Sequence, residues 1–150
     1  MSQNNGERAI IGHLLVGVAR LWRRAADQAL DDCGLSHATA MPLLALSRLG
    51  GSARQGVVAD YAGLEGPSIV RIADRLLAEG LVERNEDPED RRAKLLTLTE
   101  KGSKRVGEIE DILRDLRQRL LKDLDDDDLH ATARVLRALE ASLIGSEIQR

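Results

Sequence analysis

The spacing of hydrophobic and polar residues changes once along the chain. Over most of the length, apolar residues recur every three or four positions, which is typical of helices that bury one face. Between residues 81 and 99 they alternate with polar residues, which is typical of strands, and Leu96 and Leu98 share one face. The pattern predicts a mainly α protein with a small β-hairpin. Helices are predicted over residues 7–32, 36–49, 54–61, 66–79 and 100–122, with a last helix from about residue 125.

Residues 66–99 contain one predicted helix followed by the hairpin. Pro67 stands where a first helical residue is expected, because its missing N–H needs no partner there. Gly80 is expected to end this helix in a left-handed conformation, and Pro88 breaks the polar loop between the strands. A helix followed by such a hairpin is the second half of a winged helix-turn-helix. The apolar face of the helix consists of Ile69, Ile72, Ala73, Leu76 and Leu77.

The preceding residues supply the first half of the motif. Residues 50–52 are interpreted as a linker, and the helix over 54–61 is expected to turn Val57 and Val58 inward. Residues 62–64 then form the tight turn that joins the two helices of a helix-turn-helix.

The helix over residues 36–49 has a clear start signal and an internal obstacle. Ser36 is a suitable N-cap. Pro42 would remove one helical hydrogen bond and crowd the preceding turn. We therefore expect either a kink at this proline or a helix that begins nearer Thr39.

The terminal helices carry apolar stripes that one small winged domain cannot bury. We interpret residues 1–34 and 100–150 as a helical dimerisation region and residues 35–99 as the winged helix-turn-helix, together forming one intertwined unit. Thr99 is the predicted N-cap of the helix that follows the hairpin. Residues 125–128 are four consecutive aspartates, interpreted as an N-cap and a solvated first turn rather than a metal site.

Composition restricts the class of protein further. The chain has 150 residues, with no Phe, one Trp and one Tyr, which favours helices over sheets. It contains no apolar run of the roughly 18 residues that a membrane span requires, and residues 1–8 lack the apolar core of a signal peptide. The single cysteine, Cys33, cannot form an internal disulfide, so we expect a cytoplasmic protein. Its thiol is expected to be partly buried, with a redox sensor as the alternative, although the chain has no second cysteine to resolve a sulfenate.

Net charge is −3, which argues mildly against nucleic acid as a partner. Residues 66–94 hold six basic and seven acidic side chains, so this stretch is not a basic patch by count. DNA binding would require the acidic residues to face away from the phosphates, and Glu86, Asp87 and Glu89 in the loop are the hardest to reconcile with it.

Two stretches, GLEGPSIVRIADRLLAEGLVER and DPEDRRAKLLTLTEKG, resemble the MarR family of bacterial transcription regulators, close to its SlyA-like branch. The second matches the family's wing, with an acid, two arginines, a basic residue and then LT-x-KG entering a helix. The resemblance implies a homodimer that binds a pseudo-palindromic operator in double-stranded DNA. It also implies repression of nearby genes and, in many members, release by a small aromatic or phenolic anion bound between the domains.

Several basic and polar residues are candidate DNA contacts. Arg91 and Arg92 lie at the predicted wing tip, where arginine can enter a narrow minor groove. By resemblance, Asp90 would orient one of this pair through a salt bridge. On the recognition helix, Ser68 and Arg71 suit base edges or phosphate, and Arg75 suits a backbone contact or an inward salt bridge. The helix before it offers two further phosphate contacts, Arg54 and Gln55.

Other reactive residues are interpreted as structural. His13, His37 and His130 have no metal-ligand spacing, and no catalytic constellation or cofactor motif is present in the sequence. Trp22 is assigned to packing, with an effector pocket as the alternative. The sequence therefore indicates a regulator and not an enzyme. The main alternative is a winged-helix module that binds protein without DNA, whose partner binding would not change with salt.

Overall fold

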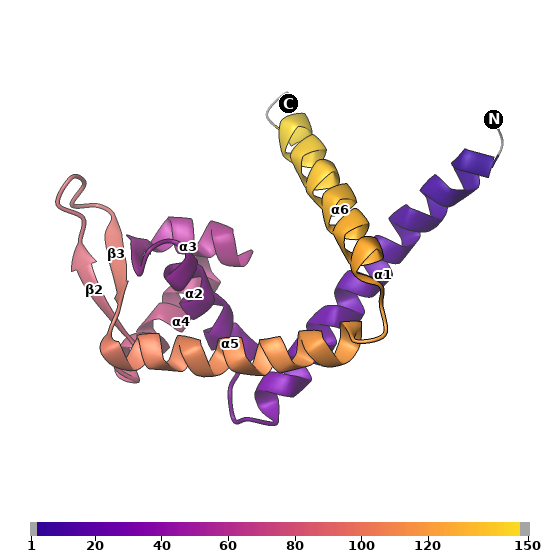
Figure 1. Cartoon of the computed structure of the whole chain (residues 1–150). Coiled ribbons are helices and arrows are strands. Elements are labelled where there is room, and N and C mark those ends of the chain that lie inside the picture. Colours follow the sequence, from indigo (N-terminus) through magenta and orange to yellow (C-terminus); the bar gives the residue numbers. More distant parts are fainter. Residues whose placement is uncertain (1–2, 148–150) are drawn as a thin grey trace. The chain divides into compact units, whose positions relative to one another are not determined.

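The computed structural model describes the backbone of residues 3–147 and the side chains of residues 6–146. These residues form six helices and one antiparallel sheet of three strands. Figure 1 shows these elements coloured along the chain. The expected mainly α fold with a winged helix-turn-helix is confirmed. In chain order the elements are α1 (Gln3–Asp31), α2 (His37–Arg48), β1 (Ser52–Arg54), α3 (Gln55–Ala62), α4 (Gly66–Ala78), β2 (Val82–Glu86), β3 (Lys94–Leu98), α5 (Glu100–Leu121) and α6 (Asp126–Glu147).

The chain divides into two compact units, Met1–Leu116 and Arg117–Arg150. The boundary falls within α5, so the first unit contains α1 to α4, the sheet and most of α5. The second contains the end of α5 together with α6. The predicted division into a dimerisation region and a DNA-binding region concerns an assembly of two chains and stays a prediction.

The sheet has one strand more than the predicted hairpin. β3 lies in the middle, and it pairs with β2 on one side and with β1 on the other. Ser52 is paired with Thr97, and their hydroxyls are 2.8 Å apart. The predicted linker at residue 52 and helix start at Arg54 were therefore wrong. β1 is only three residues long, and its partner strand lies more than 40 residues later, so no local pattern marks it.

The core of the first unit lies between the helix-turn-helix, the sheet and the first half of α5. Each surrounding element contributes buried aliphatic side chains, and α1 adds only its C-terminal end. Fully buried members are Leu30 from α1, Leu43 and Leu46 from α2, Val58 from α3, Leu76 from α4, Leu96 from β3 and Ile109 from α5.

Ser36 caps the start of α2 as predicted, and the predicted kink at Pro42 stays a prediction. The Ser36 hydroxyl accepts a hydrogen bond from the backbone N–H of Thr39 at 3.3 Å, and the helix begins at His37. The alternative start nearer Thr39 was wrong, because Ser36 already caps the helix. Pro42 lies inside α2 and is buried.

The end of α4 is joined to the start of α5 by the predicted caps. Gly80 adopts a φ of +69°, and the N–H of Leu81 donates to the carbonyl of Leu76 at 2.9 Å. The Thr99 hydroxyl donates to the Gly80 carbonyl at 2.7 Å and accepts from the Gly102 N–H at 3.0 Å. The end of α4, the hairpin and the first turn of α5 are thus held by one set of hydrogen bonds.

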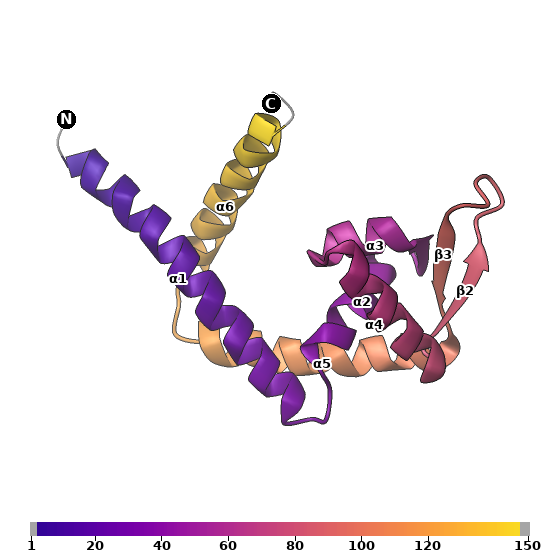
Figure 2. The ribbon, with the colours of Figure 1, turned by 180° about the vertical axis from the view of Figure 1, so that it is seen from behind.

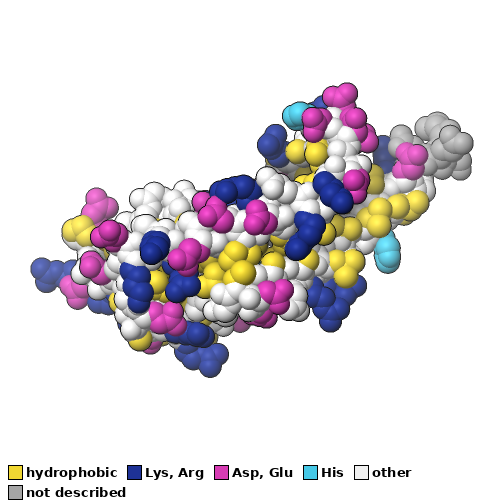
Figure 3. Space-filling model, turned by 60° about the horizontal axis from the view of Figure 1, so that its bottom comes forward, with side chains coloured by type: hydrophobic (Ala, Val, Ile, Leu, Met, Phe, Trp, Pro, Cys, Tyr) yellow, Lys and Arg dark blue, Asp and Glu magenta, His cyan; other side chains and the backbone are white. Residues whose placement is uncertain are grey.

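Two helices expose hydrophobic side chains that no part of their own unit covers. Figure 3 shows such side chains on the surface over α1 at the right of the view. In the described residues, no helix is both long and apolar enough to cross a membrane. The exposed residues include Ile10, Leu14, Val18, Leu21 and Trp22 on α1, and Val135, Leu136, Leu139, Leu143 and Ile144 on α6.

Candidate nucleic-acid interface

α4 has one buried face and one exposed face, as its sequence pattern predicts. Ile69, Ala73 and Leu76 are buried against the core. The helix begins at Gly66, so Pro67 is its second residue and not its first, although it still lies in the turn where N–H groups have no helical partner. Figure 2 shows α4 beside the base of the β2–β3 hairpin.

The exposed face of α4 carries the predicted contact residues and one that sequence reasoning missed. Arg71 is exposed, whereas Ser68 is half-buried. Val70 is 44% exposed, although it is hydrophobic. Its signal in the sequence was that it falls outside the apolar spacing of this helix. In a major groove, an apolar side chain can contact the methyl group of thymine, so Val70 joins Ser68 and Arg71 as a candidate base contact.

Ion pairs occupy the other charged residues of α4. Arg75 Nε lies 2.9 Å from Glu79 Oε1 one turn later. Both side chains are exposed, so this ion pair is not the inward salt bridge that was one of the two predicted roles of Arg75. Asp74 Oδ1 lies 2.5 Å from Arg84 Nη2 on β2. Arg71 is therefore the cation on this helix for which no ion pair is found among the described residues.

The turn between β2 and β3 forms the wing and is organised by Asp87. The Asp87 backbone N–H donates to the Ala93 carbonyl at 3.1 Å, and the Asp87 carbonyl accepts from Asp90 at 3.2 Å. One carboxylate oxygen of Asp87 accepts from the Glu89 N–H at 2.9 Å. Asp87 is therefore buried as a structural residue of the turn and does not project toward a partner.

Asp90 makes a different contact from the predicted salt bridge. Its Oδ1 accepts a hydrogen bond from the backbone N–H of Arg92 at 3.0 Å. Among the described residues, no ion pair joins Asp90 to either arginine of the wing tip. Aspartate commonly bonds the backbone two residues later in turns, so Asp90 fixes the backbone path and leaves both guanidinium groups exposed.

Arg54 lies at the end of β1 and is bonded to the wing. Its Nε donates to Asp87 Oδ2 at 2.5 Å. This hydrogen bond and the charge of Asp87 raise the pKa of Arg54 above its ordinary value. The Glu89 N–H and the Arg54 guanidinium together lower the pKa of Asp87. Arg54 was predicted as a phosphate contact from within a helix, but it precedes α3 and is engaged with the wing.

The lowered pKa of Asp87 predicts a measurable dependence of stability on acid. A carboxylate with a lowered pKa stabilises the folded state above its unfolded value, near 3.8, and this stabilisation is lost as the pH falls through the folded pKa. We expect the free energy of unfolding of Asp87→Asn to fall less between about pH 5 and pH 2 than that of the wild type. Urea denaturation at several pH values measures the difference, and parallel profiles would contradict it.

Ion pairing changes the meaning of the charge count in this region. Four acidic residues of the segment 66–94 are paired with a cation, and they include Glu86, which lies 3.4 Å from Lys94, as well as Asp87. Among the described residues, the arginines of the segment for which no ion pair is found are Arg71, Arg91 and Arg92. Glu83, Glu89 and Asp90 likewise have no ion pair among the described residues, so the unpaired charges of this stretch balance, with its unpaired arginines on α4 and at the wing tip.

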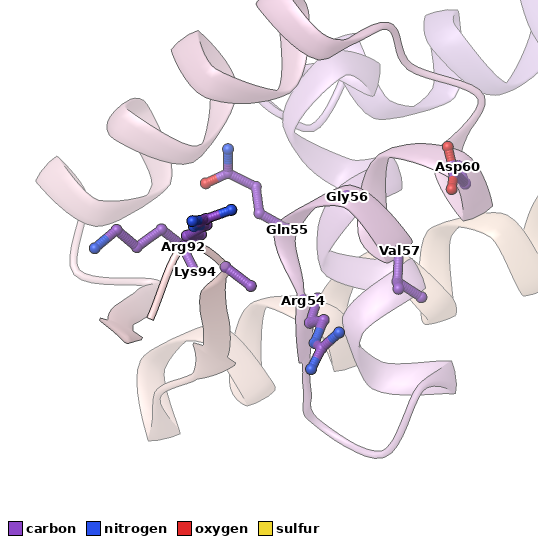
Figure 4. Close-up of a pocket in the computed structure, with 8 residues that line it drawn as sticks. Arg54, Gln55, Gly56, Val57, Asp60, Arg92 and Lys94 are labelled. Carbon is purple, nitrogen blue, oxygen red and sulfur yellow. The ribbon is translucent and has the colours of Figure 1, made fainter. Parts of the chain in front are cut away.

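A groove of about 480 Å³ separates the wing from the start of α3. Figure 4 shows that Arg92 and Lys94 line it from the wing, and Arg54 and Gln55 from the other side. Val57 also lines this groove and is 44% exposed, so the prediction that it points inward was wrong. Only Val58 of that pair is buried, because a helix turns adjacent residues to different faces.

A second, smaller cavity of about 70 Å³ lies behind α4, where the α1–α2 turn, α2 and α5 meet. Its polar lining includes Ser36, Thr39, Arg75, Glu79 and Arg105. Trp22, for which an effector pocket was the alternative to packing, lines neither this cavity nor the groove.

Cys33 lies in the turn after α1 and is exposed in the single chain. The prediction of a partly buried thiol was therefore wrong. Gly34 follows it with a φ of +71°, and the N–H of Leu35 donates to the Leu30 carbonyl at 2.9 Å.

α3 and α4 pack one face on the core and leave the other exposed, and the β2–β3 hairpin carries arginines at its tip. These features define a winged helix-turn-helix protein. A model of the MarR family matches residues 34–93. The structure of transcriptional regulator PA3341 is 36% identical in sequence with a TM-score of 0.80, covering 90% of this chain and 98% of that one. The chain belongs to the MarR family of transcription regulators.

Two further solved structures resemble the chain along most of its length. A MarR-family transcriptional regulator from Rhodococcus sp. RHA1 is 27% identical with a TM-score of 0.77, covering 88% of this chain and 93% of that one. BpsR from Bordetella bronchiseptica, whose DNA binding is regulated by 6-hydroxynicotinic acid, is 27% identical with a TM-score of 0.74, covering 87% and 98%. Placement in the SlyA-like branch stays a prediction.

Proposed function

We propose that this chain is a homodimeric regulator that binds a pseudo-palindromic operator and represses nearby genes. The observation that carries the proposal is the position of the three arginines of residues 66–94 for which no ion pair is found among the described residues. Arg71 lies on the exposed face of α4, and Arg91 and Arg92 lie at the wing tip. Arginine on a recognition helix suits guanine in the major groove, and arginine on an adjacent arm suits the minor groove.

The exposed apolar surfaces of α1 and α6 support the homodimer. Soluble monomers rarely expose large contiguous apolar patches, which commonly mark contact with a partner. A second copy of the chain would cover these helices and place two winged domains on one duplex, with half-sites about one helical turn apart.

Selection of binding sites from random duplex DNA tests this proposal directly. The expected result is one enriched motif with two half-sites, bound by a protein that sediments as two chains. A folded protein that enriches no duplex, even after unfolding and refolding to remove bound ligand, would contradict it. Binding of a protein partner that is unchanged across a salt titration would instead support the alternative, a protein-interaction module.

The effector in this proposal is a small aromatic or phenolic anion bound in the cavity behind α4. Arg75 and Arg105 supply positive charge there, and Ser36 and Thr39 supply hydroxyls. The volume of about 70 Å³ is below the roughly 300 Å³ of most ligand sites, so binding requires the cavity to widen. Because Arg75 is paired with Glu79 at the end of α4, widening at this pair would displace the recognition helix.

The substitution Arg105→Gln is expected to weaken the response to the effector without weakening DNA binding. With the selected duplex as probe, we expect 6-hydroxynicotinic acid or salicylate to release the wild type. The variant should bind the duplex normally and need about tenfold more acid for release, the effect of losing one charge-assisted hydrogen bond. Arg114→Gln is the control, because Arg114 pairs with Asp111 three residues away as Arg105 pairs with Glu108. If the acid releases both variants equally well, this cavity is not the effector site.

A further inference from the structure

The Arg54–Asp87 ion pair connects two parts of the winged domain that are distant in sequence. Arg54 ends β1 and directly precedes α3, the first helix of the helix-turn-helix. Asp87 begins the wing turn, 33 residues later. The Asp87 side chain is only 7% exposed, and that of Arg54 is 45% exposed. Asp87 is therefore largely buried in the wing turn, and its partner Arg54 lines the groove in Figure 4.

One carboxylate serves both the turn and the helix-turn-helix. Asp87 Oδ1 accepts from the Glu89 N–H, and Asp87 Oδ2 accepts from Arg54 Nε. The hairpin makes two other ion pairs. Glu86–Lys94 joins β2 to β3, and Arg84–Asp74 joins β2 to α4. Arg54–Asp87 is the described ion pair that joins the wing turn to the residue directly before α3.

We propose that Arg54 is a positioning residue that holds the wing in register with α4, and that it acts through Arg91 and Arg92 rather than through a phosphate of its own. This inference rests on the proposed function. A wing already fixed in its bound orientation loses less conformational freedom when DNA binds, which strengthens binding. The wing tip then meets the minor groove at a set distance from the bases that α4 contacts.

A double-mutant cycle distinguishes positioning from direct contact. In the wild-type background, Arg54→Gln should weaken binding of the selected duplex by about tenfold, within the range of coupling between interacting residues. In the Arg91→Ala/Arg92→Ala background, the same substitution should change affinity by less than about twofold. A direct phosphate contact predicts equal loss in both backgrounds, and a salt slope lowered by about 0.9 for each phosphate lost, also in the alanine background.

The substitution Asp87→Asn is expected to change DNA affinity differently if Arg54 positions the wing than if Arg54 binds a phosphate. The asparagine keeps an oxygen that can accept from Glu89 but loses the charge that holds Arg54. If Arg54 positions the wing, Asp87→Asn weakens binding by about tenfold, and the double variant with Arg54→Gln binds no worse than either single variant. If Arg54 binds phosphate, freeing it from Asp87 leaves affinity unchanged or raises it, which would overturn the proposal.

Control measurements distinguish a misplaced wing from an unfolded variant and from a protein that does not bind DNA at all. Arg114→Gln removes one paired arginine elsewhere in the chain and should bind like the wild type. Circular dichroism and thermal melting must show each variant folded at the assay temperature. Hydroxyl-radical footprinting should show that Arg54→Gln loses minor-groove protection beside each half-site while protection over the half-sites persists. Equal weakening of both protections would indicate a merely structural effect and overturn the positioning role. A wild type that selects no duplex would contradict the proposed function instead.

Discussion

Replacing Arg91 or Arg92 with alanine is expected to lower affinity for the selected duplex by about a hundredfold while leaving the fold intact. A contact of this kind contributes about 1–3 kcal/mol, and a homodimer loses two contacts for each substitution. Two losses of about 1.4 kcal/mol correspond to a hundredfold change in the dissociation constant. Both side chains are exposed at the wing tip, so their removal leaves no cavity and no buried group without a partner.

The measurement is a binding titration at several salt concentrations, with thermal melting of the same samples. Loss of these arginines should reduce the steepness of the salt dependence as well as the affinity, because each contact releases counterions. Arg114→Ala removes an equal charge from α5 and serves as the control. If both single variants bind like the wild type at physiological salt, the wing does not contact DNA.

The main parts of the interface could be predicted from sequence because their signals are local. The apolar spacing of α4, the left-handed cap at Gly80, the capping threonine Thr99 and the alternation of β3 each depend on neighbouring residues. Such signals are determined by backbone geometry within one or two turns. They placed Arg71 on the exposed side of the recognition helix and the wing arginines in a turn.

The rest depended on contacts between distant residues. β1 exists because Ser52, Ala53 and Arg54 find partners on β3, and three residues show no period of their own. The pairing of Arg54 with Asp87 links residues that neither motif relates. The sequence did contain a turn signal at Asp87, which precedes a proline, but nothing nearby identified its cation.

Contacts between distant residues also explain why the charge composition was a poor guide to DNA binding. Counted along the chain, residues 66–94 hold more acidic than basic side chains, and this weakened the case for DNA. In the folded chain, Asp74, Glu79, Glu86 and Asp87 are paired with cations. The exposed pairs among them contribute little to stability. Pairing leaves three acids and three arginines of this stretch without an ion pair among the described residues, so its unpaired charge is balanced rather than acidic.

Gly102→Ala is expected to destabilise the fold more than any other single substitution considered for this chain. A β-carbon at Gly102 would lie 1.9 Å from the Leu81 carbonyl oxygen and 3.2 Å from Leu98 Cδ2. The Leu81 backbone cannot easily move, because its N–H donates to Leu76 and its carbonyl accepts from Thr99. We expect a loss of about 3 kcal/mol or more, the upper range for overpacking, and a melting temperature lower by roughly 6–12 °C.

Gly107→Ala, in the same helix, is the matched control for this loss. No atom lies within 4 Å of a β-carbon placed there, and alanine favours a helix over glycine by about 1 kcal/mol. It should therefore melt at or above the wild-type temperature when both are measured at equal protein concentration.

If Gly102→Ala melts within a degree or two of the wild type, the contact with Leu81 is not rigid. A large loss would instead explain physically why the KG of the LT-x-KG motif contains glycine: the first turn of α5 must pass directly against the carbonyl that follows the recognition helix. Operator binding should then fail at temperatures where the variant unfolds and recover below them, because Gly102 contributes to the fold and not to a DNA contact.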